Sequence, residues 1–340
     1  MAVATGTYHA LALMKSGEVY GWGSNENGQL GGWDIHNKTR PQLIVDIPDK
    51  VVGLAAGAYH SLALTARNKV YGFGRNIEGQ LGVGTAQEIK RPRLIKGIHD
   101  KVVSLAAGDY HSLALTEGGD IYSWGENVHG QLGDGSTNHS EFPQLIKGIP
   151  GKVIGITAGS HHSLAVLENG MVFGFGENTF GQLGDETKTD KTHPQLIESI
   201  PAKVVGIAAG AIHTVALLQS GKVYGCGYNE NGQLGVRITK GDGPHLNEAL
   251  PGKVISIAAG NYHTLALLDN GTVYGCGSNE NGQLGSDNFS KEITHDFIPI
   301  IISKMEKSTI LCPFGKGGKA VGYTELERKF RELLGQEISL

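Results

Sequence analysis

Short apolar runs separated by turn residues recur along the chain, and one unit shows the pattern clearly. Residues 51–56 form an apolar run that ends at Gly57. Residues 60–65 form a second run, in which the side chains on both alternating faces are apolar or small. Such a run is typical of a strand buried on two sides. Residues 70–74 are β-branched, aromatic or Gly, as in a third strand, and Pro92 opens a fourth that suits a sheet edge. The unit therefore predicts a small sheet of three or four strands.

This unit is present six times. Gly-Gln-Leu-Gly begins at residues 28, 79, 130, 181, 232 and 282, in steps of 51, 51, 51, 51 and 50 residues. A Gly-x-x-His motif keeps the same step and supplies one histidine per unit, namely His9, His60, His111, His162, His213 and His263. One such sheet cannot bury both faces alone, whereas radial stacking buries them in a β-propeller. We therefore expect an all-β fold, a six-bladed propeller over residues 1–302, closed by pairing a terminal strand with the other end of the chain. A linear solenoid is the structural alternative.

The remaining residues, 303–340, carry no repeat marker. Within them, residues 323–334 predict a short amphipathic helix, because Thr324 and Glu327 form a capping box and Gly335 supplies a stop. Its apolar positions share one face: Leu326, Phe330, Leu333 and Leu334. This segment could dock on the seam or base of the propeller, bind a partner, or build part of a seventh blade.

Composition and charge narrow the function. The net charge is −4, which argues against a nucleic-acid-binding surface of clustered basic residues. The sequence contains no run of 18 apolar residues, so we expect no membrane span. The first residues lack a signal-peptide pattern. Three cysteines favour a reducing compartment over a disulfide framework. We expect a soluble intracellular monomer, cytoplasmic rather than nuclear, delivered into the host cell if its source is an intracellular bacterium.

Catalytic and metal-binding patterns are weak. One histidine per blade is spread round a ring and cannot converge on one ion, so we expect the six repeat histidines to be structural, bonded to backbone of the adjacent turn. Gly315–Lys319 lacks the spacing and hydroxyl of a phosphate loop. Cys226 and Cys276 occupy one repeat position and are expected to be buried free thiols. The sequence shows no hydrolytic, redox or transferase constellation, and we expect no metal and no cofactor.

The positions that vary between repeats are the candidates for recognition. The two residues between the repeat Gly and His lie in a turn and should ring one face of the propeller. They form an interface or pack between blades, and the sequence favours neither. The pairs are Thr7-Tyr8, Ala58-Tyr59, Asp109-Tyr110, Ser160-His161, Ala211-Ile212 and Asn261-Tyr262. The divergent loops after Gly-Gln-Leu-Gly are expected to build the second face.

The unit resembles the regulator of chromosome condensation repeat. Gly57-x-x-His60-Ser61-Leu62-Ala63-Leu64, Gly79-Gln80-Leu81-Gly82 and Pro92-x-Leu94-Ile95 carry the resemblance, which covers nearly nine-tenths of the chain. It implies a propeller, typically of seven blades. Exchange-active members use the loop ring, including acidic residues beside the repeat His, to engage the small GTPase Ran.

The resemblance bears on individual residues. Asp109 matches such an acidic position. Five residues occupy equivalent ring positions without matching the acid, namely Tyr8, Tyr59, Tyr110, His161 and Tyr262, and Asn261 completes the candidate interface. The repeats are uniform in length, so the wedge-like hairpin of exchange-active members is absent, as is a basic N-terminal tail. The resemblance therefore implies either a regulator of a Ran-like GTPase, as exchange factor or activator, or a non-catalytic scaffold for another protein.

Overall fold

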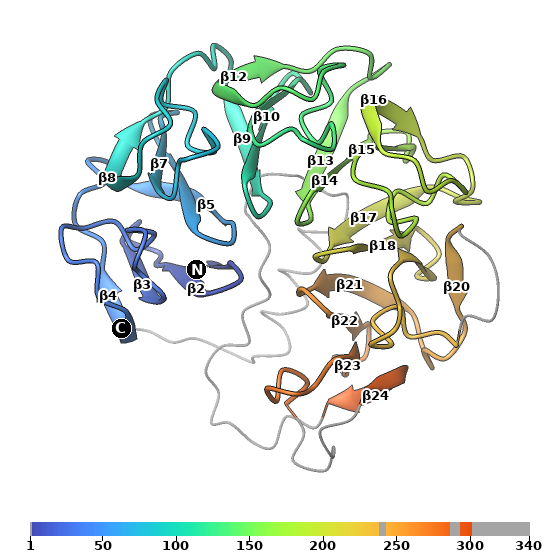
Figure 1. The fold of residues 1–340 in the computed structure, drawn as a ribbon. Coiled ribbons are helices and arrows are strands. Elements are labelled where there is room, and N and C mark those ends of the chain that lie inside the picture. The colour runs from blue at the N-terminus through green and yellow to red at the C-terminus, as the bar shows by residue number, and fades with distance from the viewer. Residues whose placement is uncertain (1, 238–242, 286–292, 301–340) are drawn as a thin grey trace.

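The computed structural model describes residues 2–237, 243–285 and 293–300. Every regular element in these ranges is a strand, and the strands form six four-stranded antiparallel sheets. Figure 1 shows these sheets as blades arranged around a common axis, from blade 1 in blue to blade 6 in orange. The expected all-β, six-bladed propeller is confirmed. The predicted helix at 323–334 lies outside the described residues.

Each blade uses four strands that are consecutive in the chain, in order from the axis outward. The innermost strands are β1 (Ala2–Thr5), β5 (Val51–Ala56), β9 (Val102–Ala107), β13 (Val153–Ala158), β17 (Val204–Ala209) and β21 (Val254–Ala259). The second strands are β2 (His9–Leu13), β6 (His60–Thr65), β10 (His111–Thr116), β14 (His162–Leu167), β18 (His213–Leu218) and β22 (His263–Leu268). The third strands are β3 (Val19–Gly23), β7 (Val70–Gly74), β11 (Ile121–Gly125), β15 (Val172–Gly176), β19 (Val223–Gly227) and β23 (Val273–Gly277). The outer strands are β4 (Lys38–Leu43), β8 (Ile89–Leu94), β12 (Ser140–Leu145), β16 (Lys191–Leu196), β20 (His245–Asn247) and β24 (Thr294–Ile300).

The expected closure by strand exchange is not found in the described part of the chain. Blade 1 contains only residues of the N-terminal repeat, and blade 6 only residues of the sixth. Figure 1 shows the six blades as an arc whose two ends are blade 1 and blade 6. The repeat supplies all four strands of its own blade, so pairing between the chain ends is not needed to complete either sheet.

Neighbouring blades pack through two different apolar faces. Leu62 and Leu64 of blade 2 point toward blade 3 and form one core with its Trp124. Ala63 and Phe73 of blade 2 instead join the core shared with blade 1. We call these the forward face and the backward face. They differ because successive strand residues point to opposite sides of a sheet. Five such cores join consecutive blades from blade 1 to blade 6.

Buried histidines add a polar bond to each of these five interfaces. His60 Nε2 lies 2.9 Å from Ser112 Oγ of the next blade, and the bond recurs with lengths of 2.8–3.1 Å. The pairs are His9–Ser61, His60–Ser112, His111–Ser163, His162–Thr214 and His213–Thr264. The side-chain partner is thus a hydroxyl of the following blade, which the expectation of a backbone partner in the adjacent turn had missed.

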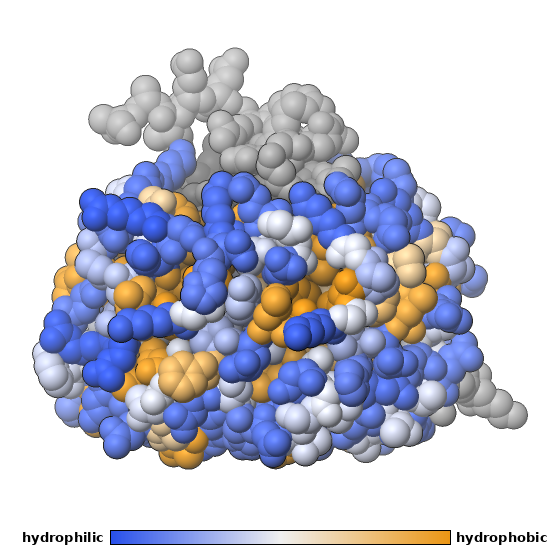
Figure 2. Space-filling model, turned by 90° about the horizontal axis from the view of Figure 1, so that it is seen from above, coloured by the Kyte–Doolittle hydropathy of each residue, from blue (hydrophilic) through white to orange (hydrophobic). Residues whose placement is uncertain are grey.

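Outside the cores, the outer strands are largely polar and exposed. Phe142 and Leu145 of β12 are apolar and yet 54% and 43% exposed. Figure 2 looks onto the rim of the ring and shows apolar patches among polar side chains. Pro at the fourth position of β4, β8, β12 and β16 removes one backbone donor from each exposed edge, which protects an edge strand from pairing with another chain.

Candidate protein-interaction face

Three kinds of loop lie at one end of the blades. The turn before β6 and the loop after β7 are joined there, because Arg75 N donates to Tyr59 O at 2.9 Å. Gly74, at the end of β7, pairs with Ile89, at the start of β8, so the divergent loop between them lies at this end as well. The expectation that these divergent loops build the second face is therefore wrong. We call this end the loop face, and the opposite end the turn face.

A glycine at the end of each third strand makes this crowding possible. Gly125 has a φ of +104°, and a Cβ there would lie 2.5 Å from Tyr110 O. Only glycine combines that backbone conformation with so close an approach. The strand can therefore turn sharply into the outer loop while remaining bonded to the inner turn, which brings both loops of a blade onto one surface.

Aromatic rings of four consecutive blades form a row on the loop face. The centroids of Tyr8 and Tyr59 are 5.0 Å apart, those of Tyr59 and Tyr110 6.1 Å, and those of Tyr110 and His161 6.0 Å. Tyr8 is 52% exposed. A hydrogen bond with Tyr8 raises the pKa of Tyr59 to about 12, with burial adding to the shift. The sequence analysis offered either an interface or packing between blades for these positions. The rings do contact one another between blades, and an interface role stays a prediction.

Asp109 is turned into the ring beneath this row. Burial raises the pKa of its carboxyl group, against hydrogen bonds from the Ser160 and Thr7 side chains that favour the ionised form. Its backbone N also donates to Ser160 O at 3.2 Å. The carboxylate thus ties together side chains of three blades, and only part of its surface is left to meet a partner.

His161 carries charge into the same region. Its Nδ1 lies 2.8 Å from a carboxylate oxygen of Glu126. Burial opposes protonation of the ring, but the hydrogen bond to Glu126 and the nearby negative charges outweigh it and raise the pKa of His161. Asn261 and Tyr262 of blade 6 are exposed on the same face, and Asn261 Nδ2 lies 3.5 Å from Thr7 Oγ1 of blade 1.

A ring of acidic residues surrounds the aromatic row, a feature that the sequence analysis missed. The loop after the third strand carries one Glu in every blade: Glu26, Glu78, Glu126, Glu177, Glu230 and Glu280. Among the five residues that follow the strand-ending Gly of each blade, the only Lys or Arg is Arg75. Its guanidinium group pairs with Glu78 at 2.8 Å and lies 5.4 Å from the ring centroid of Tyr110. The signal lay in the sequence, as a Glu within four residues of each strand-ending Gly. Ile77, Val128 and Phe180 expose apolar side chains from these loops.

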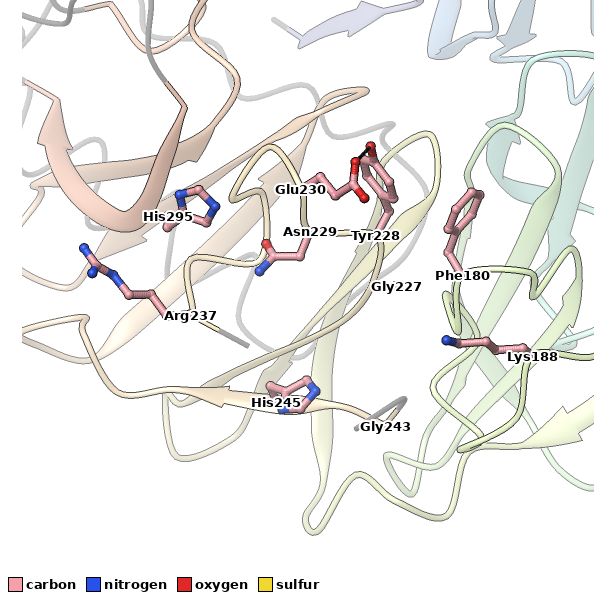
Figure 3. A pocket seen from close by; sticks show the side chains of 10 residues that line it. All are labelled: Phe180, Lys188, Gly227, Tyr228, Asn229, Glu230, Arg237, Gly243, His245 and His295. Carbon is pink, nitrogen blue, oxygen red and sulfur yellow. Dashed lines mark hydrogen bonds between the residues drawn. The ribbon is translucent and has the colours of Figure 1, made fainter. Parts of the chain in front are cut away.

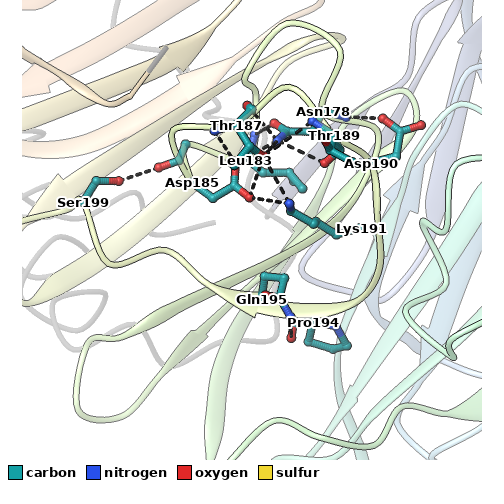
Figure 4. A network of polar contacts seen from close by, with 11 residues as sticks. Asn178, Leu183, Asp185, Thr187, Thr189, Asp190, Lys191, Pro194, Gln195 and Ser199 are labelled. Atoms are coloured by element: carbon teal, nitrogen blue, oxygen red, sulfur yellow. Dashed lines mark hydrogen bonds and ion pairs between the residues drawn. The ribbon is translucent and has the colours of Figure 1, made fainter. Parts of the chain in front are cut away.

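One asparagine in each of these loops, buried in every blade except the fifth, holds the loop in shape. Asn178 Oδ1 accepts from Leu183 N at 2.9 Å, while its Nδ2 donates to Asp185 and to Thr187 O. Lys191 closes the network with Asp185 at 3.0 Å (Figure 4). The equivalent asparagine bonds the Leu of Gly-Gln-Leu-Gly in every blade. The divergent loop is thereby anchored to an invariant turn, and its exposed side chains vary on a fixed support.

The loop face also holds a cavity of about 400 Å³ between blades 4, 5 and 6. Figure 3 shows Phe180 and Tyr228 on one side of it and His245 and Arg237 on others. The Phe180 and Tyr228 rings meet edge to face at 5.2 Å, and the Tyr228 hydroxyl donates to Glu230 at 2.6 Å. The cavity offers a mixed aromatic and polar recess beside the aromatic row.

The repeat histidines of blades 1 to 5 and two cysteines are buried. In the described ranges, no three His, Cys, Asp or Glu side chains lie together as metal ligands. Burial lowers the pKa of His9 to about 4 and that of His60 to about 3. Cys226 and Cys276 are buried free thiols.

Comparison with known proteins places these features in a family. The model of the RCC1-like domain matches residues 1–205 and 102–312. The ultraviolet-B receptor UVR8 of Arabidopsis thaliana is 36% identical over 240 residues, covering 69% of this chain and 54% of the receptor. Human E3 ubiquitin-protein ligase HERC2 is 34% identical over 245 residues, covering 70% of this chain and 5% of the ligase. The chain thus spans about half the length of one relative and a small part of the other.

Solved structures agree with this assignment. Human WBSCR16 superposes with a TM-score of 0.81 at 27% identity, covering 89% of this chain and 81% of that one. Prp20p of Saccharomyces cerevisiae, whose structure was described with its binding to Gsp1p and histones, gives 0.80 at 26% identity, covering 97% and 85%. No helix in the described residues is long and apolar enough to cross a membrane. The chain belongs to the RCC1-like domain family.

Proposed function

We propose that this chain is a protein-binding propeller that regulates a small GTPase of the Ran class, as exchange factor or activator, through its loop face. The observation that carries the proposal is the aromatic row, exposed at Tyr8, together with the Glu of each neighbouring loop, exposed at Glu26, Glu230 and Glu280. Aromatic side chains supply contact area at low entropic cost, and a field of one sign speeds the encounter with a basic partner. Structural similarity to Prp20p, described with its binding to Gsp1p, supports the choice of partner.

Exchange by this route needs no covalent step. The partner's switch region would lie on Tyr8, Tyr59 and Tyr110, with Asn261 and Tyr262 at the far side, and binding would loosen the nucleotide. Because binding energy is the only source of catalysis here, the state that must be bound best is the nucleotide-free GTPase. We further propose that the protein acts inside the cell, since its cysteines fit a reducing compartment, and that it acts there as a monomer.

A second candidate is a non-catalytic scaffold for another protein. Two observations favour it: the repeats lack a wedge-like insertion, and the carboxylate of Asp109, which matches the acidic position of exchange-active members, is bonded within the ring. The scaffold would use the same face without acting on a nucleotide. The two candidates therefore differ in the outcome of binding rather than in its place.

Release of labelled GDP from purified Ran, with and without the protein, distinguishes them. The test variant carries three exposed loop-face changes, Glu26→Gln, Glu230→Gln and Glu280→Gln, and the matched control carries three exposed turn-face changes, Glu168→Gln, Glu248→Gln and Asp269→Asn. We expect acceleration of release that the test variant weakens several-fold and the control retains. Equal weakening by both would move the site off the loop face. No acceleration and no binding to nucleotide-free Ran would remove the GTPase proposal and leave the scaffold.

A further inference from the structure

At the two ends of the arc of blades, an apolar blade face is only partly covered, whereas the equivalent face of the other blades is buried. In blades 1 to 5, three forward-face positions on the second and third strands are at most 5% exposed. Their equivalents in blade 6, Leu265, Leu267 and Val273, are only half-buried. In blades 2 to 6, three backward-face positions are at most 4% exposed, whereas Ala10, Ala12 and Trp22 of blade 1 are half-buried.

Blade 6 and blade 1 do not meet in the way that other neighbours do. A Cβ on Gly82 would lie 2.9 Å from Trp124 of the next blade, and one on Gly133 would lie 2.8 Å from Phe175. At the equivalent Gly285, the only atom found within 4 Å belongs to Ile300 of the same blade, and Trp22 is not reached. No hydrophobic core among the described residues joins blade 6 to blade 1. The two apolar faces therefore flank a seam rather than form an interface.

The path of the chain indicates what lies at this seam. In blades 1 to 4, seven residues link each outer strand to the first strand of the next blade, and this linker carries the chain onto the forward face. The outer strand β24 ends at Ile300, in the equivalent place on blade 6, so the residues after it start at the edge of the seam. Forty residues follow, against the 44 that separate the start of β5 from the end of β8.

We propose that residues 301–340 occupy the seam and cover both exposed blade faces. The apolar positions of the segment, Leu326, Phe330, Leu333 and Leu334, would supply the contacts that a blade supplies elsewhere. Leu265 and Leu267 would meet them from one side and Trp22 from the other. The segment lacks the Gly-x-x-His and Gly-Gln-Leu-Gly markers, so it closes the ring by apolar contact rather than as a seventh copy of the repeat. This inference is independent of the GTPase proposal.

Photo-crosslinking tests the location directly. In the full chain, p-benzoylphenylalanine in place of Phe330 should crosslink within the molecule to β2, β3, β22 or β23, as read by mass spectrometry of the peptides. Crosslinks to the loop face or to the outer strands would overturn the proposal. Crosslinks between two molecules would overturn it in favour of a second copy of the chain at the seam.

A matched pair of variants tests the contact by a second route. Phe330→Ala with Leu333→Ala truncates the apolar face, whereas Arg328→Ala with Glu332→Ala truncates polar positions of the same segment. In a Trp33→Phe background, the fluorescence arises from Trp22 at the seam and from the fully buried Trp124. We expect the first pair to shift the emission to the red, raise quenching by acrylamide and lower Tm by several degrees, and the second pair to leave all three unchanged. Equal behaviour of the two pairs would refute the inference.

Discussion

Removing one hydroxyl at a blade interface should destabilise the whole ring. Ser112 Oγ donates its single hydrogen to Gln80 O at 2.7 Å, so the 2.9 Å bond to His60 Nε2 has to be donated by the imidazole. That fixes the hydrogen of His60 on Nε2 and keeps the ring neutral, in agreement with a pKa lowered to about 3 by burial. Ser112→Ala deletes both bonds at once.

The two deletions differ in cost. Gln80 O also accepts from Trp124 Nε1 at 2.9 Å, so this carbonyl keeps a partner. His60 is fully buried, and its Nε2 hydrogen would be left without an acceptor. An unsatisfied buried donor costs about 1–3 kcal/mol. For a chain of 340 residues, that corresponds to a fall in Tm of roughly 1–4 °C.

Thermal unfolding of Ser112→Ala and Ser112→Thr, compared with the unmodified chain, provides the assay. Ser112→Thr keeps the hydroxyl, and Thr214 and Thr264 show that the same interface accepts threonine in other blades. We expect Ser112→Ala to lower Tm by roughly 1–4 °C and Ser112→Thr to lower it much less. If Ser112→Ala unfolds at the temperature of the unmodified chain, the bond contributes nothing and the reasoning about a buried donor is refuted.

Three further predictions follow from burial. Burial lowers the pKa of His9 to about 4 and that of His60, His162 and His213 to about 3. These values lie below the unfolded value of 6.5, so the four histidines add stability above pH 6.5 that is lost as pH falls through that value toward 3. Tm should therefore drop steeply between pH 6.5 and 4.5, and a flat profile would contradict this. Gly133→Ala, at a φ of +68° with Phe175 2.8 Å from the new Cβ, should cost more than about 1 kcal/mol in denaturant unfolding, whereas Gly32→Ala, which meets no atom within 4 Å, should cost little. Burial raises the pKa of the Cys226 thiol to about 12, so iodoacetamide should label Cys226 only after unfolding; labelling of the native protein, read by mass spectrometry, would show that the thiol is accessible.

The sequence predicted the blades because each strand is specified within a single repeat. The alternation in residues 60–65, the Pro in the outer strand and the Gly at each turn act over a few residues, and a step of 51 residues multiplies them six times. The end of the molecule to which a loop belongs depends instead on strand direction summed over a whole blade. The divergent loops were assigned to the wrong face for that reason, although the pairing of Gly74 with Ile89 leaves only one place for them.

The candidate face was predicted as a set of positions rather than as a surface. Tyr8, Tyr59 and Tyr110 were identified because they break the repeat, but their stacking depends on the angle between blades, which no local pattern specifies. The acidic ring was missed for the opposite reason. Its members recur in every repeat, and residues shared by all repeats were expected to belong to the scaffold. A residue that recurs and remains exposed can instead build a charged surface by repetition.

The same distinction bears on how the ring closes. Ser or Thr follows the repeat histidine in blades 2 to 6 and accepts the bond from the preceding blade, whereas blade 1 has Ala10 at this position. Direct contact between blade 6 and blade 1 would bury His263 against Ala10, which offers no acceptor. In the structure His263 is only half-buried and no apolar core of the described residues joins the two blades, so the missing hydroxyl and the missing core occur together. A hydroxyl is kept where a neighbouring histidine needs it. Ala10 therefore indicates, from the sequence alone, the blade whose second strand bonds no histidine of a preceding blade.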